Sequence, residues 1–200
     1  MTPHVPRLHV IADCASLADE AVRGGAPAVQ VRIKGSGDAA VLAECQRIVA
    51  AAHRSQAMVI VNDRADIALA AGADGVHGGA DDLPVSVLRR LLGPDRLVGG
   101  TARDPETALR HQADGASYVG VGPVYATATK DGLPDPLGPA GVEKVATAVD
   151  IPVIAIAGIT AARVQEMLDA GAHGVAVIGA VAHASDPAVA TAELLEALGG

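Results

Sequence analysis

The sequence is almost free of aromatic side chains. It contains no tryptophan and no phenylalanine, and Tyr118 and Tyr125 are its only tyrosines. Two rings are too few for the stacking platform on which binders of single-stranded nucleic acid place successive bases. The formal net charge of −8 points the same way, because nucleic-acid binders carry a basic surface. We therefore expect no nucleic-acid partner.

Cysteines and long apolar stretches are scarce as well. Cys14 and Cys45 are the only cysteines, which excludes a disulfide framework and a four-cysteine zinc site. The longest strongly apolar stretch, 151–162, contains Pro152 and is shorter than the roughly 20 residues of a membrane-spanning helix. Polar residues scattered through 1–16 leave no apolar segment typical of a signal peptide. We expect a cytoplasmic protein with no membrane partner, and a homo-oligomer is one alternative for its assembly.

Short runs of valine, isoleucine and leucine are abundant, and they alternate with longer alanine-rich amphipathic segments. Half of the chain is hydrophobic and 19% is charged, which is typical of a globular domain. The runs predict strands at 8–12, 28–33, 58–61, 75–77, 97–99, 118–121, 153–157 and 175–178. The segments between them predict helices at 16–24, 38–54, 64–71, 84–92, 104–113, 138–149, 160–170 and 186–198. Several runs are apolar without interruption, as in parallel strands that are covered on both faces.

Eight strand–helix units in 200 residues predict an α/β protein with a single (β/α)8 TIM barrel that spans 1–200. An open, doubly wound sheet is the alternative. That fold usually carries a glycine-rich dinucleotide turn after its first strand, and residues 12–15 contain no glycine. Because the loops at the C-terminal ends of the strands carry the chemistry of a barrel, we look for candidate residues there.

Two cations lie at the end of the second predicted strand. Residues two apart on a strand face the same side, so Gln30, Arg32 and Lys34 share one face. The apolar residues between them predict that this is the inner face, near the mouth of the barrel. Arginine binds phosphate oxygens in a fork and lysine adds a point charge, so the three side chains predict an anion site.

Two aspartates follow the next two predicted strands. Asp63 comes after the strand at 58–61, and Asp82 comes after the strand at 75–77. Each alone is typical of a helix cap. Together, at neighbouring strand ends, they match the carboxylates that bind Mg²⁺ along with substrate phosphates. We therefore predict a Mg²⁺ site at Asp63 and Asp82.

The loop after the sixth predicted strand is long for so short a barrel. It runs to residue 138 and carries Thr127, Thr129 and Lys130. Two hydroxyls and an ammonium group within four residues are typical of a mobile anion clamp, although a solvated turn is the alternative. Thr101 offers a further hydroxyl after the fifth strand.

A second anion site is predicted at the last two strands. Gly158 and Gly179 follow them, where barrels often bind phosphate through backbone N–H groups. Two anion sites without an evident general base indicate one reaction class: a diphosphate leaves with help from Mg²⁺ and cations, and a second phosphorylated substrate attacks the remaining carbon. We expect small phosphorylated molecules as substrates.

The order and spacing of these motifs resemble the thiamine phosphate synthase family, which is related to thiazole tautomerases. The resemblance runs over 8–187 and is carried by Gln30-x-Arg32-x-Lys34, Asn62-Asp63, Gly75-Val76-His77 leading to Asp82, Gly122-Pro123-Val124-Tyr125-x-Thr127-x-Thr129-Lys130 and Ala155-Ile156-Ala157-Gly158-Ile159. It implies a (β/α)8 transferase that joins an aminopyrimidine methyl diphosphate to a thiazole phosphate, giving thiamine phosphate and diphosphate.

The resemblance also implies a role for each matching residue. It assigns the pyrimidine diphosphate to Gln30, Arg32, Lys34, Asn62 and Lys130, with Arg32, Lys34 and Lys130 as the catalytic cations. It assigns Mg²⁺ to Asp63 and Asp82. It assigns the thiazole phosphate to Thr127, Thr129, Gly158, Ile178 and Gly179.

The sequence departs from the usual pattern of the family at four loops. Residues 78–80 read Gly-Gly-Ala instead of Leu-Gly-Gln, and residues 100–103 read Gly-Thr-Ala-Arg instead of Val-Ser-x-His. Ala157 replaces a glycine, and Gly179 replaces a serine. These changes leave weakened or redirected activity as alternatives to full synthase activity.

Two other functions are therefore kept as alternatives. A thiazole tautomerase relies on the histidine that Arg103 replaces, and it tends to lack the metal-site aspartate and the Thr-x-Thr-Lys loop that this chain has. A non-catalytic binding protein for thiazole or thiamine phosphate is favoured by Ala80, which removes a pyrimidine contact. The cations and the aspartate pair disfavour it, because a binding protein needs no diphosphate clamp.

Overall fold

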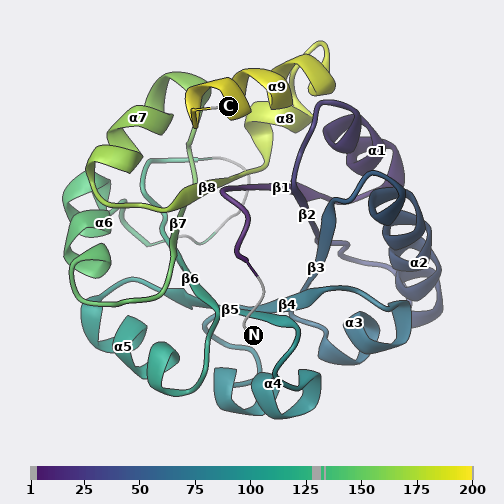
Figure 1. Cartoon of the computed structure of the whole chain (residues 1–200), viewed down its shortest axis with the longest axis horizontal. Coiled ribbons are helices and arrows are strands. Elements are labelled where there is room, and N and C mark those ends of the chain that lie inside the picture. The colour runs from purple at the N-terminus through teal and green to yellow at the C-terminus, as the bar shows by residue number, and fades with distance from the viewer. Residues whose placement is uncertain (1–3, 128–131, 133, 200) are drawn as a thin grey trace.

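The structure, a computed structural model, describes residues 4–127, 132 and 134–199, and it confirms the predicted (β/α)8 barrel. Eight parallel strands close in sequence order, and helices form a ring around them (Figure 1). The strands are β1 (Leu8–Ala12), β2 (Ala28–Val31), β3 (Met58–Asn62), β4 (Gly75–Gly78), β5 (Leu97–Ala102), β6 (Tyr118–Val121), β7 (Val153–Ile156) and β8 (Gly174–Val177).

The helices follow the strands in alternation, apart from two that follow β8. They are α1 (Ala15–Arg23), α2 (Asp38–Arg54), α3 (Ala65–Ala71), α4 (Val85–Leu92), α5 (Pro105–Ala113), α6 (Gly138–Ala146), α7 (Ala161–Asp169), α8 (Gly179–Ala182) and α9 (Pro187–Ala197). Sequence periodicity does not predict α8, because four residues are too few to show a helical period. Within the described ranges, no helix is both long and apolar enough to cross a membrane.

Two strands differ in length from the prediction by two residues or more. β2 ends at Val31 instead of residue 33, because the Arg32 N–H makes a last bond to the Ala12 carbonyl (2.8 Å) and the chain then leaves the sheet. β5 continues to Ala102, beyond the predicted end at residue 99. Its glycine-rich second half is held as strand by pairing with β4 on one side and β6 on the other.

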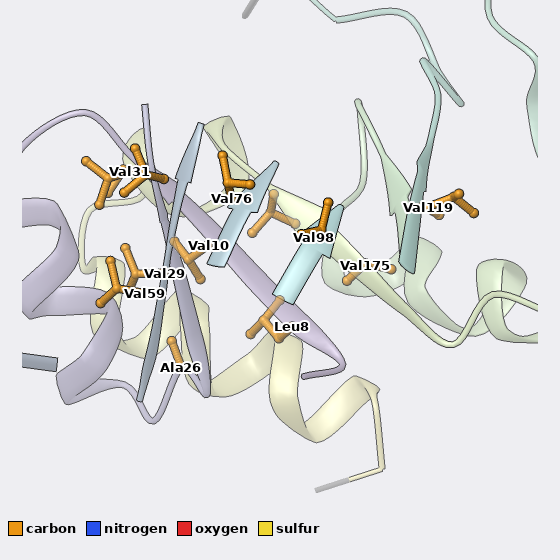
Figure 2. Close-up of a cluster of buried hydrophobic side chains, with 14 of the residues drawn as sticks. Leu8, Val10, Ala26, Val29, Val31, Val59, Val76, Val98, Val119 and Val175 are labelled. Atoms are coloured by element: carbon orange, nitrogen blue, oxygen red, sulfur yellow. The ribbon is translucent and has the colours of Figure 1, made fainter. Parts of the chain in front are cut away.

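Side chains alternate between two apolar layers. Val29, Val59, Val98 and Val119 point outward and belong to the large cluster between the strands and the helices (Figure 2). A smaller cluster fills the barrel interior, and it contains Ile11, Ile60, Leu97, Tyr118 and Ile154. The period of two therefore directs every second strand residue into the lumen.

The segment before β1 covers one end of the lumen. Residues 4–7 cross the barrel in Figure 1, and Val5 joins the inner apolar cluster. The strands run away from this end, so their C-terminal ends and the loops that follow them surround the opposite mouth. The mouth is where the candidate residues lie.

Candidate active site

Gln30 lies inside the barrel, and the two predicted cations lie just above it. Val29 and Val31 pack against the helices, so Gln30 points into the lumen between Ile11 and Ile60, where it is 4% exposed. Because β2 ends at Val31, Arg32, which the prediction placed within the strand, stands with Lys34 in the loop that leads to α2. Arg32 is partly buried and Lys34 is exposed.

The carboxylates of Asp63 and Asp82 converge at the mouth. Asp63 follows β3 with a left-handed backbone (φ 66°), a conformation that aspartate tolerates better than most residues, and its N–H donates to the His77 carbonyl (2.8 Å). Asp82 Oδ2 accepts the N–H of Gly79 (2.8 Å). A methyl group added to Gly79 would stand 2.6 Å from Asp82 Oδ2 and 3.8 Å from Asp63 Oδ1, so one point lies close to both carboxylates.

The charges at the mouth act on one another. Burial raises the pKa of Asp63 to about 6, and hydrogen bonding to Asp82 and repulsion by its charge add to the rise. The positive charges of Arg32 and Lys34 oppose the rise. The structure thus brings together four of the predicted residues, two acids and two cations, in one electrostatic environment.

The aspartate pair fits a divalent cation. The half-buried Asp63 carboxylate and the exposed Asp82 carboxylate repel each other unless a proton or a cation lies between them. No cluster of three or more histidine, cysteine, aspartate or glutamate side chains with a metal-binding arrangement occurs in the part of the chain that the structure describes. Two carboxylates completed by phosphate oxygens and water are a usual environment for Mg²⁺, and Asp63 and Asp82 are the residues that would hold it.

Below the charged mouth, the lumen carries a cluster of neutral polar side chains. His77 Nδ1 lies 3.1 Å from the Tyr118 hydroxyl, and His77 Nε2 lies 3.0 Å from Thr101 Oγ1. The rings of His77 and Tyr118 stack at 5.6 Å, and Gly99 leaves room for them: a methyl group there would stand 2.3 Å from Tyr118 Cζ. A cavity of about 60 Å³ remains, lined by these side chains together with His9, Gln30, Gly120, Ile154, Ile156 and Ala176.

The two histidines of the lumen are uncharged. Burial lowers the pKa of His77 to about 4, and the nearby His111 charge adds to this. Burial lowers the pKa of His9 to about 3, and His77 adds to this. A small neutral pocket with hydrogen-bonding groups suits an uncharged heterocycle. No sequence motif indicated His9 or Tyr118 as site residues. The signal that could have found them is a histidine or tyrosine at an inward position of an apolar strand.

The remaining predicted residues lie at β3 and at β6–β8. Asn62 ends β3 opposite His77. Gly158 (φ 69°) follows β7 after Ala157, whose φ of 80° is also left-handed. Ile178 caps α8, and Gly179 is its first residue. β7 and β8 are neighbours, so these loops are adjacent.

The loop after β6 is described only in part. Thr127 is partly buried. Thr129 and Lys130 lie outside the described residues. The other end of this loop is held by Arg103, whose Nη2 donates to the Asp135 carbonyl (2.8 Å). Arg103, which follows β5, is therefore a contact of this loop.

A larger cavity of about 350 Å³ lies at the opposite end of the barrel. It is lined by His4, Pro6, Arg7, Pro27, Gln56, Met58, Leu195 and Leu198. None of the candidate residues in the described ranges is among them. The smaller cavity is the candidate active site, because Asp63, whose pKa is raised, lies near the charges of Arg32 and Lys34.

Known proteins with similar sequences and structures agree on the family. A family model described as thiamine monophosphate synthase matches residues 5–181. A thiamine-phosphate synthase of Salinispora tropica is 54% identical over 171 residues, which cover 85% of this chain and 82% of the relative. One of Salinibacter ruber is 42% identical over 204 residues, with 98% and 90% covered.

A solved structure, thiamine phosphate pyrophosphorylase from Pyrococcus furiosus, superposes with a TM-score of 0.88 at 34% identity and covers 96% of this chain and 95% of its own. A 3-hexulose-6-phosphate synthase at 21% identity shares the fold alone (TM-score 0.72). The match of the family model and the high identities extend over the strands and loops that build the mouth of the barrel. This chain belongs to the thiamine monophosphate synthase family.

Proposed function

We propose that this protein is a transferase that joins an aminopyrimidine methyl diphosphate to a thiazole phosphate, forming thiamine phosphate and releasing diphosphate. The observation that carries the proposal is the meeting of Asp63 and Asp82 with the charges of Arg32 and Lys34 above a neutral pocket. The family of the chain supports it.

The reaction breaks one bond and forms another. The bond between the pyrimidine methylene carbon and the diphosphate oxygen breaks, and its electron pair leaves with the diphosphate. The pyrimidine ring stabilises the methylene cation that remains. The thiazole nitrogen then donates its lone pair to this carbon, so that no separate base is needed.

The charged residues stabilise the leaving group. Arg32 and Lys34, with Lys130 from the loop after β6, would neutralise the negative charge that grows on the departing diphosphate, and Asn62 would contact it beside them. Bound Mg²⁺, held by Asp63 and Asp82, would add positive charge at the diphosphate oxygens.

The neutral pocket would hold the pyrimidine ring. The amide of Gln30, the His77 ring and the Thr101 hydroxyl all line it, and each can hydrogen-bond to ring nitrogens or an amino group. Since burial keeps His77 neutral, the pocket does not repel the cation that forms when diphosphate leaves.

The loops on the other side of the mouth would hold the thiazole phosphate. Backbone amides at Gly158, Ile178 and Gly179 can donate to phosphate oxygens, and the hydroxyls of Thr127 and Thr129 would complete the site. The two substrates would then meet above the lumen, held from opposite sides.

The test is a complete reaction with purified protein, both substrates and Mg²⁺. We expect equimolar release of diphosphate and formation of thiamine phosphate, both dependent on each substrate. Isomerisation of a thiazole phosphate without diphosphate release would favour a tautomerase. Binding of either substrate without any turnover would favour a binding protein, and both results would contradict the proposal.

A further inference from the structure

The loops after β6 and β7 are in close backbone contact. The Val124 N–H donates to the Ile156 carbonyl (2.9 Å), and the Tyr125 N–H donates to the Ala157 carbonyl (3.1 Å). A methyl group added to Gly158 would stand 2.6 Å from Tyr125 Cβ, so only glycine permits this approach. The two loops are therefore joined at this point by backbone hydrogen bonds and close packing.

Arg163 of α7 touches both loops with one guanidinium group. Its Nη1 donates to the Gly158 carbonyl (2.6 Å), and its Cζ lies 4.1 Å from the centre of the Tyr125 ring. A planar guanidinium can hydrogen-bond at its edge while its face attracts an aromatic ring, and lysine lacks this combination.

Glu166, which lies one turn further along α7, holds the other end of Tyr125. The Tyr125 hydroxyl donates to Glu166 Oε2. Burial raises the pKa of Tyr125 to about 12, and the bond to Glu166 adds to this, so the hydroxyl keeps its proton. Tyr125, Arg163 and Glu166 together form what we call the Tyr125 clamp.

We propose that the Tyr125 clamp is a positioning device for the thiazole phosphate, and that it sets the affinity for this substrate and not for the pyrimidine diphosphate. The inference rests on the proposed function. The clamp residues themselves are positioning residues, because they act through the loops that they hold.

The conformation of the loop after β7 explains how the clamp would raise the affinity for thiazole phosphate. Peptide planarity turns the Ile159 N–H away from Arg163 once the Gly158 carbonyl is bound to it. The same bond fixes a loop in which Ala157 and Gly158 are both left-handed, a conformation that is sparsely populated in a free chain. A loop that is already ordered loses less entropy when an anion binds, and its affinity is higher for that reason.

The position of the clamp in the barrel explains its selectivity. β7 is four strands away from β3 in the closed order, so the two strands lie on opposite sides of the barrel. The clamp is on the β7 side, and Asp63 and Asp82 follow β3 and β4. Loosening the clamp should leave the acids and cations that follow β2, β3 and β4 in place.

The test compares clamp variants with a matched arginine control. Arg163→Ala and Tyr125→Leu should each raise the Kd of thiazole phosphate alone, measured by calorimetry, and its KM by about tenfold, which is the loss of one charge-assisted contact. The KM of the pyrimidine diphosphate should change less than about twofold. Tyr125→Phe keeps the ring under Arg163 and should cause a smaller rise. Arg110→Ala on α5 is the control, because it removes an exposed arginine whose Nη2 donates to Thr107. This variant should change neither the Kd of thiazole phosphate nor the KM of either substrate.

Each result bears on one claim. The proposed role of the Tyr125 clamp would be overturned if Arg163→Ala and Tyr125→Leu both left the Kd of thiazole phosphate unchanged. An equal rise in the KM of both substrates would also overturn it. Circular dichroism and the milder Tyr125→Phe variant separate misfolding from loss of positioning. If the wild type binds thiazole phosphate without turnover, the proposed function fails while the Kd series still decides the clamp; if it does not bind thiazole phosphate, the clamp is overturned.

Discussion

The two sides of the barrel mouth would bind an anion in different ways. On the β2–β4 side, Arg32 and Lys34 place full positive charges beside a pair of carboxylates. On the β7–β8 side, the candidate residues are glycines and an isoleucine that offer backbone amides. A leaving diphosphate gains charge during the reaction, whereas the phosphate of the other substrate does not. Full positive charges stabilise an anion whose charge grows during the reaction, and backbone amides suffice where the charge is constant.

The largest expected effect concerns the charged side. Lys34→Ala should lower kcat/KM for the pyrimidine diphosphate by about 100-fold, because a cation that acts on the leaving group is lost. The KM of thiazole phosphate should stay within about twofold of wild type. Lys144→Ala, which removes an exposed lysine of α6, is the matched control. If Lys34→Ala and Lys144→Ala had equal kcat/KM values for the pyrimidine diphosphate, the β2–β4 side would have no special role in binding the leaving group.

The next effect concerns the pH dependence of stability, which the neutral pocket below both sides of the mouth influences. His9 is fully buried with a folded pKa of about 3, and an unfolded histidine titrates near 6.5. Between these values the unfolded chain binds more protons, so stability falls as the pH drops below 6.5. His9→Gln should reduce the loss of unfolding free energy between pH 7 and pH 5 by about 2 kcal/mol in urea denaturation. Identical pH dependence in both proteins would show that the lumen accepts a proton.

A smaller effect on the Mg²⁺ requirement is expected from the aspartate pair, which belongs to the charged side of the mouth. Asp82→Asn should raise the Mg²⁺ concentration at half-maximal activity by about tenfold, since a neutral amide is a weaker ligand than a carboxylate. Asp81→Asn changes the exposed neighbouring acid and should leave the Mg²⁺ titration unchanged. If both variants shift the titration equally, the effect is a general one of surface charge.

The smallest effect concerns the backbone side. Ala157 has a φ of 80°, where a β-carbon is strained. Ala157→Gly should raise the unfolding free energy by about 1 kcal/mol, measured by urea denaturation. Ala70→Gly at an exposed position of α3 is the control of opposite sign, and it should lose about 1 kcal/mol. Destabilisation by Ala157→Gly would show that the loop holds its alanine without strain.

The sequence predicted the barrel because each strand is an apolar run with a helix-forming segment behind it. It also predicted that Arg32, Lys34, Asp63 and Asp82 come together, because strand order alone places their loops at one mouth. The roles of these residues stay predictions. The placement of Arg32 within a strand was wrong, since β2 ends at Val31 and alternation does not set where pairing stops.

Other parts of the site depend on contacts that no local pattern encodes. His77 and Tyr118 stack in the lumen only because Gly99 on the strand between theirs leaves space. Arg163 reaches Tyr125 from a helix 38 positions later in the chain, and such a pair has no signal in a single sequence. The short α8 has no period of its own, and its position follows from the strand before it.

The most direct test of the central claim is titration calorimetry of aminopyrimidine methyl diphosphate with the wild-type protein, once in Mg²⁺ and once in EDTA. Our account predicts that Mg²⁺ tightens binding at least about tenfold and that Asp82→Asn abolishes most of this gain. An identical Kd in Mg²⁺ and in EDTA would contradict the claim that the aspartate pair and its neighbouring cations neutralise the diphosphate.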